Sequence, residues 1–138
     1  MHDFKLFPEL TNNQMMMHYF ESPHRQITED FRAKVVKVTD GDTIRVKWSE
    51  RDFDFPIRFL DIAAPELDEE GGEKSQSWLE NLILNQEVDV LIDNNNRVEK
   101  WGRLLGTIIF MGMNINELSL LGNMSIPFEL EEGVLKWN

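Results

Sequence analysis

The chain has 138 residues, of which 41% are hydrophobic and none is cysteine, and its formal net charge is -11. This length fits a single domain with one core. The lack of cysteine excludes disulfides, thiolate metal sites and a thiol nucleophile, and the net negative charge disfavours nucleic-acid binding driven by charge alone, because that affinity comes from Lys and Arg at phosphates.

The acidic residues are concentrated in the middle of the chain. Residues 61–93 contain ten acidic and one basic side chain, whereas residues 32–58 contain seven basic and five acidic ones. No apolar run approaches the ~20 residues that span a bilayer, and the N-terminus lacks the basic and apolar regions of a signal peptide. We therefore expect a soluble protein without a signal peptide and without a membrane partner.

Residues 1–31 show no sustained period of two or of 3.6, and they are rich in methionine and aromatic residues, such as the run Met15-Met16-Met17. Such a stretch is either a frayed terminus or an arm that lies on an apolar surface, of its own domain or of a neighbouring chain. We expect an N-terminal extended arm that contacts a protein partner or an assembly.

Three β-strands are expected next. Residues 33–38 and 43–48 alternate apolar and polar side chains, and Asp40-Gly41 between them is typical of a tight turn, so the two runs predict an antiparallel pair. Residues 53–62 predict a third strand, in which Pro56 indicates an edge or a bulge.

The remaining elements are two helices and two strands. Trp78, Leu79, Leu82 and Ile83 share one face of a predicted helix, and Gly122 ends a second, shorter one. The predicted elements are a helix over 73–84, strands over 87–93 and 103–111, and a helix over 114–121. This order predicts an α+β fold, a five-stranded OB-type barrel with packed helices. The predicted division is an arm over 1–31, the barrel over 32–122 and a tail over 123–138.

Three short runs lie at the ends of predicted strands. They are Asp40-Gly41-Asp42-Thr43, the stretch from Arg58 to Pro65-Glu66, and Lys100-Trp101-Gly102-Arg103. In this order, with an amphipathic helix between the second and the third, they resemble the staphylococcal nuclease-like (thermonuclease) family over roughly residues 33–122. The resemblance implies hydrolysis of phosphodiesters with Ca²⁺, an ion that is held by six to eight oxygen ligands.

The resemblance assigns a role to each matching residue. It implies that two arginines hold phosphate oxygens, that one carboxylate handles the attacking water, and that a carboxylate and a backbone carbonyl bind the metal. A basic and an aromatic residue then contact the terminal phosphate and the base. The catalytic residues are Arg58, Glu66 and Arg103, the metal ligands are Asp42 and the backbone carbonyl of Ala64, and the nucleic-acid-binding residues are Lys100 and Trp101.

Ala63 departs from this pattern, because the family has a metal-binding Asp at this place. Loss of a residue that only hydrogen-bonds a metal ligand lowers metal affinity ~10–100-fold, and loss of a charged ligand itself lowers it at least as much. We therefore expect Ca²⁺ to bind weakly or not at all. Asp61 would replace the missing ligand only if a bulge moved it, since it lies two residues earlier. Purely structural roles are also open: Asp42 as a turn residue, and Arg58 paired with Glu66.

Two functions follow from these residues. The one that we favour is a catalytically impaired nuclease-like domain that acts as a structural or protein-interaction subunit, for example of a large assembly such as a phage virion. It depends on Ala63, the acidic charge and the N-terminal arm. The alternative is a Ca²⁺-dependent, phosphodiester-cleaving nuclease, which depends on Asp42, Arg58, Glu66 and Arg103.

Overall fold

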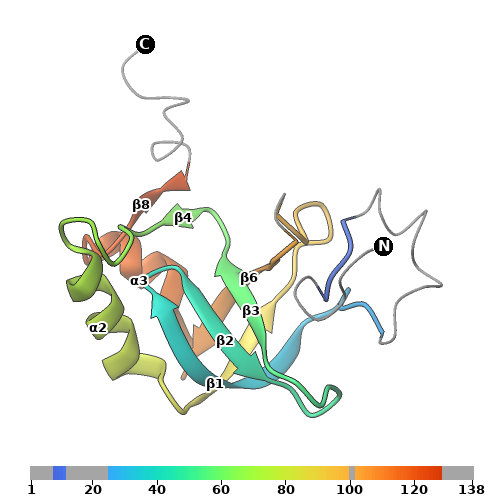
Figure 1. Ribbon diagram of the computed structural model, residues 1–138. Helices are drawn as coiled ribbons and strands as arrows, with labels where there is room; N and C mark the ends of the chain where they lie inside the picture. The colour runs from blue at the N-terminus through green and yellow to red at the C-terminus, as the bar shows by residue number, and fades with distance from the viewer. Residues whose placement is uncertain (1–7, 12–24, 100–101, 129–138) are drawn as a thin grey trace.

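The structure is a computed structural model that describes residues 8–11, 25–99 and 102–128. Five strands form a closed barrel, in the order β3-β2-β1-β5-β6 with an additional pairing of β3 with β6 (Figure 1). The predicted five-stranded OB-type barrel is confirmed. Its strands are β1 (Phe31–Asp40), β2 (Thr43–Lys47), β3 (Phe55–Phe59), β5 (Glu87–Leu91) and β6 (Leu104–Phe110).

The alternation of side chains explains why β1 and β2 form one wall of the barrel. In β2, Ile44 and Val46 are buried, while Lys47 at the end of the strand is exposed. This is expected for a strand that has one face on the core. The two strands are antiparallel, and the turn between them closes at Asp40 opposite Thr43. This turn presents Asp42 at one end of the barrel.

The barrel closes where β3 and β6 pair in parallel, with Arg58 opposite Leu105 and Phe59 opposite Gly106. A Cβ atom at Gly106 would lie 2.7 Å from a methyl group of Val90 inside the barrel, so only glycine fits here. Pro56 is paired with β2, and the described pairing with β6 begins one residue later, at Ile57; β3 as a whole is not an edge strand, because it has a neighbouring strand on each side.

The predicted third strand over 53–62 is too long. Residues Phe53 and Asp54 are not in a strand, β3 ends at Phe59, and Leu60 and Asp61 form a turn before a separate short strand, β4 (Ile62–Ala63). Asp61 has a φ of 65°, a left-handed conformation outside the β region. The run looked continuous because its residues are apolar on both sides of the turn.

Two helices pack on the barrel, close to their predicted positions. Helix α2 (Gly72–Ile83) buries Leu79 and Ile83 against the core. Helix α3 (Ile115–Leu121) follows the short strand β7 (Met113–Asn114); the Asn114 side chain accepts from the N–H of Glu117 at the helix start, and Gly122 caps its end. No helix in the described part of the chain is long and apolar enough to cross a bilayer.

The chain after α3 contains one more strand, β8 (Ile126–Pro127), which the sequence did not predict. It pairs with β4, placing Ile126 opposite Ala63, and the two form a separate small sheet above the barrel (Figure 1). Ser75 of α2 also donates to the carbonyl of Met124, at 2.8 Å. The start of the predicted tail is therefore held against the barrel.

The described parts of residues 1–31 contact the barrel. Glu9, Leu10 and Ile27 are buried, and Phe31 already belongs to β1. The methionine-rich run that motivated the predicted arm lies outside the described residues. The division into arm, barrel and tail stays a prediction.

Candidate functional site

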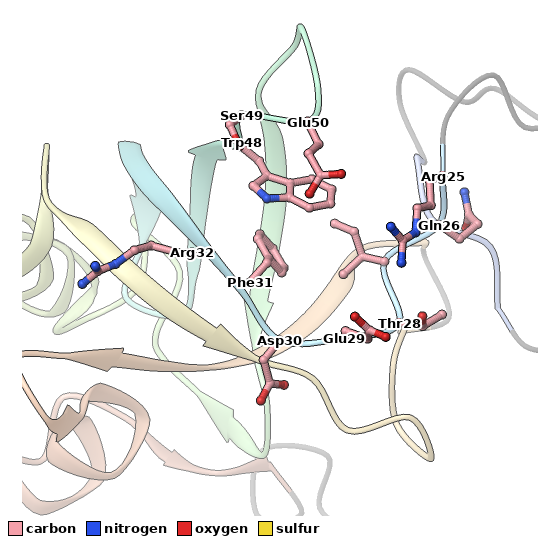
Figure 2. Close-up of a pocket in the computed structure, with 11 residues that line it drawn as sticks. Arg25, Gln26, Thr28, Glu29, Asp30, Phe31, Arg32, Trp48, Ser49 and Glu50 are labelled. Atoms are coloured by element: carbon pink, nitrogen blue, oxygen red, sulfur yellow. The ribbon is translucent and has the colours of Figure 1, made fainter.

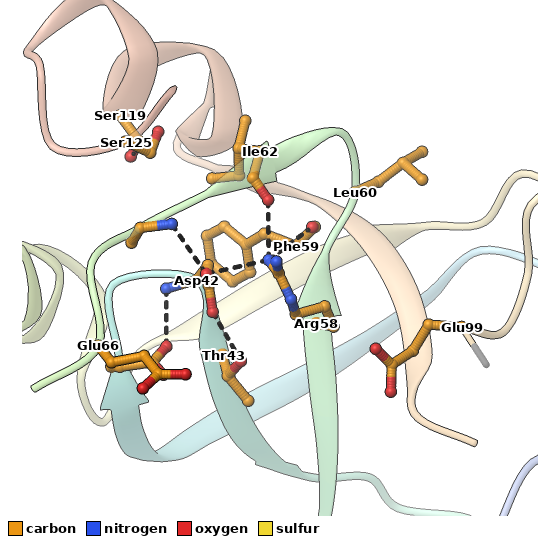
Figure 3. A network of polar contacts seen from close by, with 12 residues as sticks. Asp42, Thr43, Arg58, Phe59, Leu60, Ile62, Glu66, Glu99, Ser119 and Ser125 are labelled. Atoms are coloured by element: carbon orange, nitrogen blue, oxygen red, sulfur yellow. Dashed lines mark hydrogen bonds and ion pairs between the residues drawn. The ribbon is translucent and has the colours of Figure 1, made fainter. Parts of the chain in front are cut away.

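Asp42 occupies the centre of the candidate site, in the turn between β1 and β2. Its carboxylate accepts three contacts: Oδ1 accepts from the hydroxyl of Thr43 at 2.9 Å, and Oδ2 accepts from the backbone N–H of Ala64 at 2.8 Å. Nη1 of Arg58 lies 3.1 Å from the same Oδ2. Figure 3 shows Asp42 between these groups, so its side chain is fixed from two sides.

Arg58 reaches Asp42 from β3. Besides the ion pair, its Nη1 donates to the carbonyl of Ile62 at 2.8 Å, across the turn that separates β3 from β4. The Phe128 ring lies 5.8 Å from the Arg58 guanidinium carbon, close enough for a cation–π contact. The sequence left open a pair between Arg58 and Glu66; the described ion pair of Arg58 is with Asp42 instead.

Arg103 precedes β6 and is held by Glu99. Nε and Nη2 of Arg103 donate to the two carboxylate oxygens of Glu99 at 2.8 and 3.1 Å, which is a bidentate pair. Hydrogen bonding to Glu99 raises the pKa of the Arg103 guanidinium above its ordinary value. Nη1 of Arg103 also donates to the hydroxyl of Thr43 at 3.3 Å, so Thr43 connects Arg103 to Asp42.

Glu66 and Ala64 lie on the segment after β4. Ala64 faces Asp42 with its backbone N–H, while Glu66 is exposed, and its own N–H donates to the Glu69 side chain at 2.7 Å. The described contacts thus bring Asp42, Arg58 and Arg103 together around Thr43, and they do not bring Glu66 to these residues. Lys100 and Trp101 lie outside the described residues, and the roles of all these residues stay predictions.

Comparison with known proteins agrees with this arrangement. A family model described as staphylococcal nuclease homologue matches residues 56–121, which include Arg58, Ala63, Glu66 and Arg103. This chain contains a staphylococcal nuclease-like domain. The resemblance seen in the sequence is thereby confirmed, and with it the fold that it implied.

Three relatives show how far the similarity extends. The chain is 37% identical over 79 residues to a protein of Shigella flexneri named micrococcal nuclease, covering 57% of this chain and 42% of the relative. It is 32% identical over 101 residues to an uncharacterized endonuclease of Escherichia coli O157:H7, covering 72% of this chain and 63% of the relative. It is 33% identical over 79 residues to protein ParB of Escherichia coli, covering 57% of this chain and 42% of the relative. The chain thus spans between 42% and 63% of these relatives' lengths.

Nucleases of this family use Ca²⁺, so the residues of the nuclease-like domain can be compared with the oxygen ligands that this ion needs. Ala63 is 3% exposed and pairs with Ile126 of β8, so the position offers a buried methyl group where the resemblance implies a metal-binding carboxylate. Among residues 8–11, 25–99 and 102–128, no group of three or more Asp, Glu or His side chains is placed to hold a metal ion. Asp61, the conceivable substitute, is exposed in the turn before β4. The described residues therefore do not fit a Ca²⁺ cage.

Asp40 adds a second carboxyl group to the turn of the nuclease-like domain. Its Oδ1 accepts from the backbone N–H of Asp42 at 3.0 Å. Burial, with the neighbouring Asp42 carboxylate as a further cause, raises the pKa of Asp40 from 3.8 to about 6. Two carboxyl groups this close repel each other when both are ionised, so Asp40 keeps its proton to a higher pH than an ordinary aspartate.

Sequence reasoning missed three residues of this site: Thr43, Glu99 and Phe128. Thr43 belonged to a quoted motif, but its hydroxyl gains two partners only when β6 closes the barrel. Glu99 had a local signal, because it lies four residues before Arg103, although no helix connects the two. Phe128 had no signal, since only the pairing of β4 with β8 brings it to Arg58.

A cavity of about 320 Å³ lies away from Asp42, at the opposite end of the hairpin of β1 and β2. Figure 2 shows Phe31 and Trp48 on one side of it and Arg25 and Gln26 on the other. The two rings lie 5.0 Å apart in a tilted arrangement. This cavity is separate from the candidate site of the nuclease-like domain.

Proposed function

We propose that this chain is a catalytically impaired nuclease-like domain that acts as a structural or protein-interaction subunit. The observation that carries the proposal is the buried methyl group of Ala63 in the pair of β4 with β8. An alanine side chain supplies no oxygen to a hard cation, and the Asp42 carboxylate of the candidate site already has Thr43, Ala64 and Arg58 as partners.

The two arginines support the same proposal. Arg58 lies in β3 and Arg103 directly precedes the neighbouring strand β6, but each guanidinium is paired with a carboxylate, Asp42 for one and Glu99 for the other. A phosphate would have to compete with these carboxylates for the same N–H donors. The site therefore binds a phosphodiester less readily than one whose arginines are unpaired.

The role as a subunit, for example in an assembly such as a virion, is supported by charge and by exposed apolar side chains. The chain has a net charge of -11, which disfavours nucleic acid as a partner. Ile126 and Phe128 are 46% and 38% exposed on or next to β8, an edge strand of the small sheet. Exposed apolar side chains beside an unpaired strand edge are typical of a surface that another protein covers.

The alternative function is a Ca²⁺-dependent nuclease that cleaves phosphodiesters. It is supported by Asp42, which contacts Arg58 directly and Arg103 through the Thr43 hydroxyl, and by the names of two relatives, a micrococcal nuclease and an uncharacterized endonuclease. Under this alternative, the chain as it stands binds Ca²⁺ and cleaves DNA or RNA.

One experiment separates the two functions. The chain and its Ala63→Asp variant are incubated with single-stranded DNA and with RNA, in Ca²⁺ and in a chelator, while calorimetry measures Ca²⁺ binding. We expect the chain itself to cleave neither substrate, and the variant to bind Ca²⁺ at least ~10-fold more tightly. Ca²⁺-dependent cleavage by the unmodified chain would establish the alternative.

The matched control is Ala64→Asp, which adds the same charge one residue along the chain. Successive side chains of an extended segment point to opposite sides, so this carboxylate is not placed as a family ligand is. Equal Ca²⁺ affinities of the two variants would show that the added negative charge raises the affinity wherever it is placed. The proposal could then no longer rest on the residue at position 63. Circular dichroism checks that both variants remain folded.

A further inference from the structure

A second set of charged residues is buried at a different place, where residues 8–11 contact the barrel. We define these four residues as the N-terminal segment. Glu9 is fully buried, and its carboxylate pairs with Arg51 from the loop after β2 and, at 2.8 Å, with Arg97 from the loop before β6. The side chains of both arginines are 1% exposed. The candidate site uses none of these three residues.

The backbone of the N-terminal segment is bound as well. The Gln26 side chain accepts from the N–H of Leu10 at 2.5 Å and donates to the carbonyl of Pro8 at 2.8 Å. Arg97 donates to the carbonyl of Leu10, and Ile27 donates its N–H to Glu9 at 2.7 Å. Side-chain amides and arginines that bind both the backbone and a carboxylate of a short segment are arranged as in a peptide-binding site.

The charges at this site match a carboxylate from outside the barrel. Arg51 and Arg97 bring two positive charges into the interior, and Glu9 is the carboxylate that pairs with both. The guanidinium carbon of Arg51 also lies 4.6 Å from the ring centre of Phe55, so an aromatic wall contacts the cation. Removal of the segment would take the Glu9 carboxylate away from both guanidinium groups, and loss of one partner of a buried ion pair is strongly destabilising.

The sequence permits this segment to come from either of two chains. Its described polar contacts are with Gln26, Ile27, Arg51 and Arg97, all of them beyond residue 24. Thirteen residues, 12–24, separate Thr11 from Arg25, and a stretch of that length has a maximum reach of roughly 45 Å. That reach is far greater than hydrogen-bonded neighbours such as Leu10 and Gln26 require.

We propose that Gln26, Arg51 and Arg97 form a peptide-binding site that is specific for a short segment with a carboxylate followed by leucine. Its occupant in this structure is the chain's own N-terminal segment, and its occupant in trans is the same segment of a second copy of this chain. In the unmodified protein the chain's own segment is favoured, because attachment within one chain gives it an effective concentration on the order of millimolar. Exchange between copies becomes dominant when a substitution prevents the chain's own segment from binding to the site.

Two full-length variants test the exchange. Glu9→Ala retains both arginines but has a defective segment, whereas Arg97→Ala retains Glu9 but has a defective site. We expect each variant alone to have the mass of one chain, 16.2 kDa, and their equimolar mixture to form a heterodimer of twice that mass in native mass spectrometry. A mixture that contains only monomers at a concentration of 100 µM or more would overturn the exchange.

A peptide test keeps the proposal falsifiable if either variant fails to fold. The probe is a synthetic peptide of residues 6–13, and its matched control carries Glu9→Gln; the host is the full-length Leu10→Ala chain, whose own segment has lost its buried leucine. We expect the probe at millimolar concentration to raise the thermal midpoint of the host by about 5 °C, and the control peptide to leave it unchanged. No rise, or an equal rise with both peptides, would overturn the proposed site.

Discussion

Oδ2 of Asp42 lies 3.1 Å from Nη1 of Arg58, and about nine-tenths of each side chain is shielded from solvent. An ion pair that is this little exposed behaves differently from one on the surface. Removal of one partner leaves the other charge without its counter-ion in a poorly solvated place. The contact therefore links the stability of the barrel to two residues for which the resemblance implies a role in chemistry.

The first prediction concerns this pair. We expect Asp42→Ala to lower the free energy of unfolding by about 3 kcal/mol, because Arg58 loses its ion pair and the Ala64 N–H loses its acceptor. Urea unfolding at pH 7 measures the change. Asp54→Ala is the matched control, since its pair with Arg45 is well exposed and is expected to contribute less than ~1 kcal/mol. Equal losses for the two variants would contradict the role given to burial.

The second prediction concerns pH. The pKa of Asp40 is about 6 in the folded state and 3.8 ordinarily, so the folded state binds more protons between these values. Ionisation of Asp40 therefore removes stability as the pH rises from about 4 to about 6. We expect Asp40→Asn to be more stable relative to the unmodified chain at pH 7 than at pH 4, as measured by urea midpoints across this range. The exposed Asp52→Asn serves as the control, and parallel curves for Asp40→Asn would contradict the prediction.

The third prediction concerns the start of α2. A Cβ atom at Gly72 would lie 1.9 Å from the backbone oxygen of Glu66, and a backbone atom cannot turn away as a side chain can. We expect Gly72→Ala to lower the free energy of unfolding by about 3 kcal/mol or more. The control is Gly112→Ala, where φ is 78° but no atom lies within 4 Å, so a loss of only ~1 kcal/mol is expected. Thermal and urea unfolding of both variants give the comparison.

The fourth prediction concerns Asn116 on α3. Its side chain accepts from the N–H of Ile108 at 3.0 Å and donates to the carbonyls of Leu60 and Gly106, both at 3.1 Å. It therefore joins the helix, β6 and the turn that follows β3. We expect Asn116→Ala to cost about 2 kcal/mol in the free energy of unfolding, because buried polar groups lose their partners.

Asn81 provides the reference for Asn116, because it is exposed on α2. We expect Asn81→Ala to change the free energy of unfolding by less than ~0.5 kcal/mol. If the two substitutions had similar effects, the hydrogen bonds of Asn116 would not contribute to stability as argued.

The sequence predicted the barrel and both helices because local patterns determine these elements. The alternation in β2 and the apolar face of α2 can be read from neighbouring residues, and Asn114 and Gly122 mark the ends of α3. The same reasoning did not find β8, because its two residues pair with β4 from far along the chain. It also extended the third strand through Asp61, whose left-handed conformation has no strong signal in a residue other than glycine or asparagine.

The candidate site was predicted only in part, for a related reason. Asp42, Arg58 and Arg103 were recognised from short runs, and the structure places them around Thr43. Glu9 and its two arginines were missed, because Glu9 lies in a stretch without periodicity and the arginines lie in polar loops. Aromatic residues on both sides of Arg51, at positions 48 and 53, were a weak signal for a buried cation.

The parallel pairing of β3 with β6 also determines when the site can form during protein synthesis. Arg58 is opposite Leu105, so the strand that closes the barrel includes residues synthesised almost fifty positions later. A nascent chain that ends before Gly106 has Asp42 and Arg58 but lacks the strand that brings Arg103 to Thr43. Contacts between such distant parts of a chain form slowly. Most of this domain must therefore leave the ribosome before Arg58 and Arg103 can come together at the site.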